Sequence, residues 1–390
     1  MAKNIVILLD GTSNEISADR TNILRLYGSL EKSERQLVYY DPGVGTFGAE
    51  NAWLKFWRKA SEIWGMATGW GLNQNVKEAY RFLVENYESG KKTDGDGSGR
   101  DSIYIFGFSR GAYSARVLAG FLNAVGLVEK RNLNLVDYAF RAYARVEDQE
   151  DNEESFSEVR LYERLLTPDR PPIRLLGLFD TVASVIEPGR YLPRLRYHAF
   201  TRRNVSVEAI RHAVAIDERR AMFRPQLWEE GGEYRGNPFN KAGATPQDLR
   251  EVWFSGVHAD VGGGYPEKES GLAKIPLQWM IEQTKPMGLY YVTRTVNEVV
   301  LGKNSAKHYI QPDAAAERHE SMNWAWKVLE FLPSRRADGS GITMPLGKRR
   351  AIPEKAWIHK SVIERAGDGG TMPQNVPADH RVEGTAKAVK

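Results

Sequence analysis

The stretch that decides the fold runs from Ser102 to Ala112 and reads SIYIFGFSRGA. It starts as the apolar run of a buried strand, continues as the G-x-S-x-G pattern of Gly107, Ser109 and Gly111, and leads into a helical pattern. A serine between a strand and a helix lies on a sharp turn, and glycines two residues to either side remove Cβ atoms that would collide there. The pattern predicts that Ser109 is a nucleophile, with a tight turn of purely structural role as the alternative.

Apolar runs of similar length recur along the chain and alternate with segments of helical periodicity. This alternation predicts an α/β fold with a mostly parallel sheet and helices on both faces. The other predicted strands cover 4–9, 36–40, 173–179 and 251–254, and the predicted helices cover 76–87, 112–128 and 207–216.

We expect the 390 residues to form one large domain followed by a shorter appended region and a tail. We expect a catalytic domain over 1–300 with an inserted helical segment at about 48–72, an appended helical region over 301–365, and a flexible tail over 366–390. Trp324 and Trp326 are expected to fill a hydrophobic core in the appended region.

The composition excludes several functional classes. Lys and Arg number 54 against 50 Asp and Glu, a net charge of +4, and the two signs are interleaved, so no nucleic-acid partner is expected. The absence of cysteine excludes a thiol nucleophile and thiolate metal ligands. No apolar run approaches the ~18 residues of a membrane span, and the run Ile5 to Leu9 is too short for a signal peptide. We expect a cytoplasmic protein where it is made, with any export by a signal-less route.

A serine nucleophile needs a base and an acid that orients the base. In hydrolases with this turn the chain order is serine, acid, histidine, and all seven histidines follow Ser109. Asp180 ends the predicted strand IRLLGLFD and His258 follows the strand VWFSG, so both belong at the carboxyl edge of the sheet. His212 is the rival base, but its neighbours Ile210 and Val214 suggest that it lies on a helix face.

The residues after His258 predict a flexible loop that carries the base. Gly262 to Gly264 form a glycine run with no phosphate-binding G-K-[ST] after it. Asp260 is interpreted as a brace of this loop, ahead of an alternative orienting acid or a metal ligand. We expect neither a metal nor a cofactor.

Backbone N–H groups near the serine are candidates for an oxyanion hole. The N–H of Arg110 opens the predicted helix, and Gly11 and Thr12 follow the first strand, a position that often supplies a second donor. The sequence from Asp10, DGTSN, also resembles the D-x-D-G-T motif of haloacid-dehalogenase phosphatases. That interpretation fails because Leu8 occupies the nucleophilic position.

A tryptophan-rich segment is predicted to form an amphipathic helix. Trp53, Phe56, Trp57 and Trp64 share one face, and mostly basic residues occupy the other. Such a helix can lie in a membrane interface, cover the active-site crevice as a lid, or pack on the core of the hydrolase.

Four blocks in order, DGTSN, GFSRGAYSAR, LGLFDTV and VWFSGVHADVGGGY, resemble the signatures of the bacterial hydrolase family that contains the class 1 type VI secretion lipase effectors. The similarity spans about 4–285, with Ser13 where the family usually has tryptophan. It implies an α/β-hydrolase fold, Ser109, Asp180 and His258 as the catalytic triad, and glycerophospholipid acyl esters as substrates.

The sequence therefore predicts a serine hydrolase of acyl esters, most simply a phospholipase. The alternatives are a soluble carboxylesterase or thioesterase for small substrates, and a catalytically silent hydrolase fold that serves as a binding module. A lipid or acyl-ester substrate and peripheral membrane contact are expected, and an immunity or secretion partner stays open.

Overall fold

A computed structural model gives the structure of the chain. The residues that it describes are 2–11, 20–43, 70–90, 99–146, 153–182, 185–187, 194–236, 241–303, 309–322, 324–330, 334–335, 342–344, 346–367 and 371–384.

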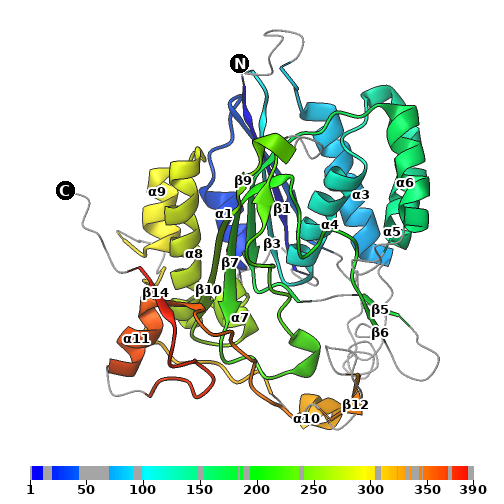
Figure 1. Ribbon diagram of the computed structural model, residues 1–390. Helices are drawn as coiled ribbons and strands as arrows, with labels where there is room; N and C mark the ends of the chain where they lie inside the picture. The colour runs from blue at the N-terminus through cyan, green and yellow to red at the C-terminus, as the bar shows by residue number, and fades with distance from the viewer. Residues whose placement is uncertain are drawn as a thin grey trace, which may run out of the picture.

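Eight strands form one sheet in the order β14-β13-β10-β7-β4-β3-β1-β2, and every neighbouring pair is parallel (Figure 1). The predicted α/β fold with a mostly parallel sheet is confirmed. The strands are β1 Asn4–Leu9, β2 Gln36–Asp41, β3 Ser102–Phe108, β4 Ile173–Phe179, β7 Val207–Ala215, β10 Asp248–Phe254, β13 Trp357–His359 and β14 Arg381–Glu383. The short hairpins are β5 Val185–Glu187 with β6 Arg194–Arg196, β8 Glu233–Tyr234 with β9 Thr245–Pro246, and β11 Ser334–Arg335 with β12 Ile342–Thr343.

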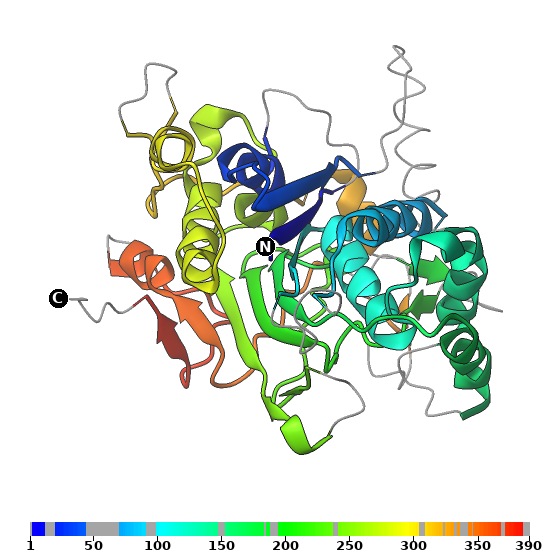
Figure 2. The ribbon, with the colours of Figure 1, turned by 90° about the horizontal axis from the view of Figure 1, so that it is seen from above.

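Helices cover both faces of the sheet, as Figure 2 shows from above. One face carries α3 Trp70–Asn86, α4 Arg110–Ala124, α5 Val136–Arg145 and α6 Glu153–Leu166, and the other carries α1 Asn22–Ser29 and α8 Gly271–Thr284. The remaining α-helices are α7 His258–Gly262, α9 Thr293–Thr295, α10 Trp324–Glu330 and α11 Lys360–Gly367.

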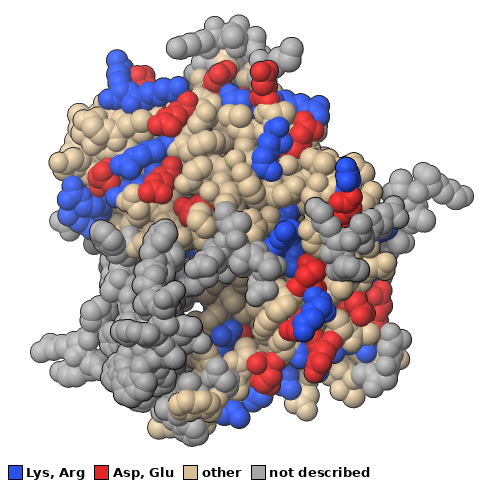
Figure 3. Space-filling view, turned by 180° about the vertical axis from the view of Figure 1, so that it is seen from behind, with Lys and Arg blue, Asp and Glu red and all other residues tan. Residues whose placement is uncertain are grey.

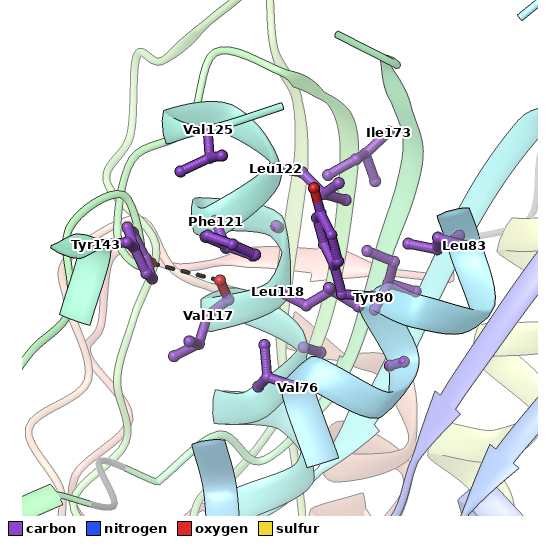
Figure 4. Packing of buried hydrophobic residues seen from close by; sticks show 14 of the residues in the cluster. Val76, Tyr80, Leu83, Val117, Leu118, Phe121, Leu122, Val125, Tyr143 and Ile173 are labelled. Carbon is purple, nitrogen blue, oxygen red and sulfur yellow. Dashed lines mark hydrogen bonds between the residues drawn. The ribbon is translucent and has the colours of Figure 1, made fainter. Parts of the chain in front are cut away.

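The core follows the alternation of side chains along the strands. Ile5 and Ile7 of β1 point to the α3 and α4 side, whereas Val6 and Leu8 point to the α1 and α8 side. Figure 4 shows the core on the α3 and α4 side of the sheet, where Tyr80 of α3 packs against Phe121 of α4 with ring centroids 4.7 Å apart. The Tyr80 hydroxyl donates to Gly126 O at 2.8 Å, so this large buried ring has no unsatisfied oxygen.

One predicted helix is wrong, because Val207–Ala215 forms β7 in the middle of the sheet. Both faces of this strand are buried, so its apolar residues lack the simple alternation of a strand that is exposed on one side. The spacing of Ile210 and Val214 therefore imitated a helical period.

The C-terminal prediction also needs correction. Residues 301–365 do contain α10 and α11, but β13 joins β10 in the main sheet, and β14, from the predicted flexible tail over 366–390, extends it. Two three-residue strands carry too little periodicity to be recognised in the sequence. The region thus completes the fold of the predicted 1–300 domain.

Trp324 does not fill a hydrophobic core, since 72% of it is exposed. Trp326, on the same short helix, packs edge-on against Phe223 at 5.6 Å. The core prediction for this pair is wrong for Trp324.

The surface carries mixed charge, with Lys and Arg interspersed among Asp and Glu over the described part of the face in Figure 3. The inserted segment at 48–72 lies outside the described residues except where it enters α3, and Trp53, Phe56, Trp57 and Trp64 lie outside them too. Among the helices of the described ranges, none combines the length and the apolar character that crossing a bilayer requires.

Candidate active site

Three strand ends bring the predicted site residues to one edge of the sheet. Ser109 directly follows β3, Asp180 directly follows β4, and His258 lies four residues beyond β10. Parallel strands end at the same edge, where an α/β sheet opens into a crevice. Chain segments far apart in sequence therefore deliver their polar groups to one place.

Ser109 occupies the sharp turn that its glycine neighbours predict. Its φ of 58° and ψ of −120° are strained for a residue with a side chain, and its N–H donates to Phe179 O at 3.0 Å. A Cβ at Gly107 would lie 2.4 Å from Gly111 O, and one at Gly111 would lie 2.1 Å from Leu9 O. Both glycines are required by the tight packing of this turn.

Ser109, His258 and Asp180 form a continuous hydrogen-bonded line. His258 Nε2 lies 2.8 Å from Ser109 Oγ, and His258 Nδ1 lies 2.5 Å from Asp180 Oδ2. An ionised carboxylate only accepts hydrogen bonds, so the imidazole carries its proton on Nδ1. Nε2 then presents its lone pair to the serine hydroxyl, which is the arrangement needed to take a proton from it.

Asp180 is fully buried and has four donors around its carboxylate. Oδ1 accepts from Ala215 N at 2.9 Å and Arg350 Nη1 at 2.6 Å, and Oδ2 accepts from His258 and from Arg350 Nη2 at 3.0 Å. Burial alone would raise the pKa of Asp180, but the charge of Arg350 and the hydrogen bond with His258 outweigh it and hold this pKa well below the usual range. The carboxylate stays ionised. Sequence reasoning missed Arg350, because no motif surrounds it.

His258 is the first residue of α7, so the prediction of a flexible loop is wrong. Its imidazole is buried between two rings, with Phe108 stacked at 4.7 Å and Phe223 edge-on at 4.9 Å. Its backbone N–H donates to Glu218 Oε2 at 3.3 Å. The His258 side chain is therefore held from several sides by packing, and its backbone is held by a hydrogen bond.

Glu218 is a buried carboxylate beside His258 that the sequence did not single out. Arg220 pairs with both of its oxygens, at 3.0 and 2.8 Å. Burial raises the pKa of Glu218, but Arg220 and His258 lower it overall to about 2. Arg220 neutralises the charge of Glu218 by an ion pair. Glu218 stabilises the start of α7 because it accepts from the backbone N–H of His258.

Asp260 braces α7. Its Oδ2 accepts from Val257 N at 3.0 Å and from His319 N at 3.2 Å, and its Oδ1 lies 2.6 Å from His319 Nδ1. Asp260 has no contact with His258 that would orient its ring. Within the described part of the chain, no group of three or more His, Cys, Asp or Glu has the geometry to hold a metal ion.

His212, the rival base, belongs to β7 and not to a helix, and its ring nitrogens are bonded to groups other than Ser109. It is fully buried, its Nδ1 lies 2.7 Å from Glu251 Oε2, and its Nε2 accepts from Thr181 N at 3.1 Å. Burial is the largest cause that lowers the pKa of His212, opposed by Glu251. With both ring nitrogens occupied, His212 is a structural histidine.

The candidate oxyanion donors differ in how far the structure supports them. Arg110 is the first residue of α4, and N–H groups in the first turn of a helix point toward its N-terminal end, here beside Ser109. Gly11 N donates to Asp10 Oδ1 at 2.7 Å, so this N–H is directed at a carboxylate. Thr12 lies outside the described residues.

The parallel sheet and the polar line at its carboxyl edge define a protein of the α/β-hydrolase class. The chain belongs to the family described as T6SS, phospholipase effector Tle1-like, catalytic domain, whose sequence model matches residues 3–283. The resemblance drawn from the four sequence blocks is thereby confirmed.

Similar proteins include one curated protein and two solved structures. The uncharacterized protein YEL023C of Saccharomyces cerevisiae is 36% identical over 234 residues, which cover 57% of this chain and 32% of that protein. An uncharacterized protein from Pseudomonas aeruginosa aligns at a TM-score of 0.42 and 21% identity, over 76% of this chain and 48% of that one. The Tle1 effector bound to the VgrG spike of the type 6 secretion system aligns at a TM-score of 0.36 and 19% identity, over 70% of this chain and 52% of that one. This chain spans about a third to a half of the length of these relatives.

Proposed function

We propose that this protein is a serine hydrolase that cleaves carboxylic esters of glycerophospholipids. The observation that carries the proposal is the line from Ser109 Oγ through His258 to Asp180, with distances of 2.8 and 2.5 Å. The same geometry argues against a silent binding module, because a fold that only binds has no need of a strained serine aligned with a buried histidine and carboxylate.

The reaction proceeds in two balanced halves. As Ser109 Oγ bonds to the ester carbonyl carbon, His258 Nε2 takes its proton, and Asp180 stabilises the resulting imidazolium. Collapse of the tetrahedral intermediate breaks the bond to the alcohol oxygen, and His258 returns the proton to this leaving group. Water then repeats the sequence on the acyl-enzyme, which releases a fatty acid and restores Ser109.

The negative oxygen of each intermediate needs donors fixed in advance. The Arg110 N–H at the start of α4 is the first donor that we propose, and one such donor is worth about 10²–10³ in kcat in serine hydrolases. We propose the segment of Gly11 and Thr12 for the second. For Gly11 this requires its N–H to leave Asp10 Oδ1 when substrate binds.

A lipid substrate is favoured by two features. The family to which the chain belongs is described as one of phospholipase effectors. Large apolar side chains are also exposed on segments beside the base: Met222 next to Phe223, Trp324 on α10, and Leu346, whose N–H donates to Glu330 O at the end of α10. Exposed apolar and aromatic side chains at the rim of a site are suited to contact with a lipid surface.

The cellular role extends the proposal by one step. We propose that the protein is made in the cytoplasm and exported without a signal peptide through a type VI secretion system, in line with its family. A secretion or immunity partner would then be required. Co-purification of the tagged chain from cells with and without the secretion spike tests this role independently of the enzymatic activity.

The activity is tested with the purified chain and vesicles of phosphatidylcholine, phosphatidylethanolamine and phosphatidylglycerol. Mass spectrometry of released fatty acid and lysophospholipid reports both the bond that is cleaved and its position. We expect release by the wild type and its loss in Ser109→Ala, together with fluorophosphonate labelling that requires Ser109. Ser102 offers a control on β3, the strand that leads to Ser109. Ser102→Ala should keep both the lipid hydrolysis and the probe labelling.

The outcomes separate the candidate functions. Turnover of short soluble esters without vesicle hydrolysis would replace the lipase with a soluble carboxylesterase or thioesterase. A folded wild type that neither hydrolyses esters nor reacts with the probe would leave the binding module.

A further inference from the structure

Arg350 lies far beyond residues 3–283, which the family's catalytic-domain model matches, yet it reaches the centre of the candidate active site. We propose that Arg350 is a positioning residue for the reaction, which holds the Asp180 carboxylate in place and limits how strongly that carboxylate binds a protonated His258. This inference rests on the proposed function.

The guanidinium grips Asp180 at two points. Nη1 donates to Oδ1 at 2.6 Å and Nη2 donates to Oδ2 at 3.0 Å, a fork that fixes the plane of the carboxylate. Asp180 has a φ of 39°, a strained backbone conformation that the surrounding contacts must hold in place. If the carboxylate turned, it would lose both bonds to Arg350 as well as the bond to His258.

Arg350 is itself fixed by backbone carbonyls. Nη1 also donates to Ala215 O at 2.9 Å, and Nη2 donates to Phe223 O. Ala215 ends β7, next to the carboxylate, and the ring of Phe223 packs on His258. One buried side chain thus ties Asp180 to the strand beside it and to the aromatic wall of the base.

The charged groups around Asp180 determine how its ion pair with Arg350 affects the proton transfer to His258. His258 and Arg350 are hydrogen-bonded to the carboxylate. The negative charge of Asp180 also acts on His212 without a hydrogen bond between them. Glu218 accepts from the backbone N–H of His258 and is paired with Arg220. Among the described residues, Arg350 is the only permanent cation bonded to the Asp180 carboxylate.

When His258 takes the proton of Ser109, a cation forms beside a carboxylate that Arg350 has already partly neutralised. Arg350 therefore offsets part of the attraction that the Asp180 carboxylate exerts on the imidazolium. Removal of Arg350 should move the acid limb of the kcat/KM profile to higher pH. A residue that merely supported the fold would lower activity at every pH without moving this limb.

The test compares Arg350→Met with Arg349→Met in full-length protein. Both changes remove one positive charge from adjacent positions, but Arg349 is exposed and lies 3.8 Å from Asp217. The readout is kcat/KM for a soluble p-nitrophenyl ester from pH 5 to 9, with thermal unfolding to show that each variant is folded. For Arg350→Met we expect a limb shifted upward by about one pH unit and a plateau reduced about 10-fold to 100-fold. For Arg349→Met we expect the wild-type profile.

Arg350→Lys keeps the test decisive if Arg350→Met does not fold. It retains the charge but loses the fork, so the limb should stay near its wild-type pH while the plateau falls at least 5-fold. Added guanidinium at low millimolar concentration should partly restore Arg350→Ala and leave Ser109→Ala inactive.

The proposal is overturned by a folded Arg350→Met with an unshifted limb, or by an Arg350→Lys plateau equal to that of the wild type. Ser109→Ala in the same assay separates failure of the role of Arg350 from failure of the proposed function. If it is inactive while Arg350→Met behaves like the wild type, only the role of Arg350 fails. If Ser109→Ala keeps its activity, the proposed function itself fails.

Discussion

Phe108 stacks on the imidazole of His258, with ring centroids 4.7 Å apart and planes inclined by 30°. Phe108 immediately precedes Ser109, so one strand end both presents the serine and supports the imidazole that faces it. Gly262 makes room for this ring, because a Cβ there would lie 1.8 Å from Phe108 Cε2. The glycine run after His258 therefore has a packing role that its sequence pattern alone does not reveal.

Gly262→Ala should displace Phe108 and, through it, His258. We expect overpacking to cost about 1–3 kcal/mol of stability, and kcat/KM to fall at least 10-fold because the imidazole loses its support. Thermal unfolding and ester hydrolysis measure the two effects. Gly28→Ala is the matched control, since nothing lies within 4 Å of a Cβ at that helical position. Wild-type values for both quantities in Gly262→Ala would contradict this account.

Asp180→Asn should abolish the proposed ester hydrolysis while it keeps a side chain of the same size. An amide nitrogen facing Nδ1 favours the imidazole tautomer with its proton on Nε2, which then cannot accept from Ser109. We expect kcat to fall on the order of 10⁴-fold. Asp248→Asn, at an exposed carboxylate paired with Arg211, serves as the control and should keep kcat within about 2-fold. An Asp180→Asn variant with more than a tenth of the wild-type kcat would exclude Asp180 as the orienting acid.

His212→Gln and His258→Gln should separate stability from catalysis. His212 is bonded on both sides, to Glu251 and Thr181, so its replacement should cost about 1–3 kcal/mol of stability. Its kcat should stay within a few-fold of the wild type. His258→Gln should lose about 10³-fold or more in kcat and remain folded. Urea unfolding and steady-state kinetics on both variants decide the assignment, and the reverse pattern would make His212 the base.

His359 should make stability depend on pH. Burial, with a smaller contribution from Lys360, lowers the pKa of His359 from 6.5 to about 4. The unfolded chain therefore binds this proton at a higher pH than the folded one, and the free energy of unfolding falls as the pH drops from 6.5 toward 4. The whole shift corresponds to about 3 kcal/mol.

The variant His359→Asn should flatten this part of the pH profile. Asn keeps an acceptor for the Ser361 hydroxyl, which lies 2.8 Å from His359 Nδ1. Chemical denaturation between pH 7 and 5 is the measurement, because Asp180 and Glu218 titrate lower. His380→Asn is the control for the loss of a histidine. An equal slope in His359→Asn and the wild type would remove His359 as the cause.

The parts of the site that sequence reasoning found are those with local signatures. Ser109 has its glycines, and Asp180 and His258 follow recognisable apolar strands. Arg350, Glu218 and Phe223 have no such signature, because their roles arise from contacts between distant segments. A buried arginine cannot be told from an exposed one in the run KRR, where only the fold decides which side chain turns inward.

The fold was likewise predictable only where an element has a local sequence signature. Strands such as β1 and β3 are long enough to show an apolar run, whereas β13 and β14 have three residues each. β7 was mistaken for a helix because buried polar residues, Arg211 and His212, interrupt its apolar pattern. Long-range pairing, and not local preference, makes these three segments strands.

The strand order has a consequence for how the protein is made. A ribosome adds Ser109, Asp180 and His258 before it reaches Arg350, β13 and β14, and domains begin to fold as they emerge. Until those last strands arrive, β10 has an open edge, the kind of surface on which nascent chains aggregate. We therefore expect a translating chain to hold its three reacting groups before it can lock them, so that competence for catalysis is acquired late in synthesis.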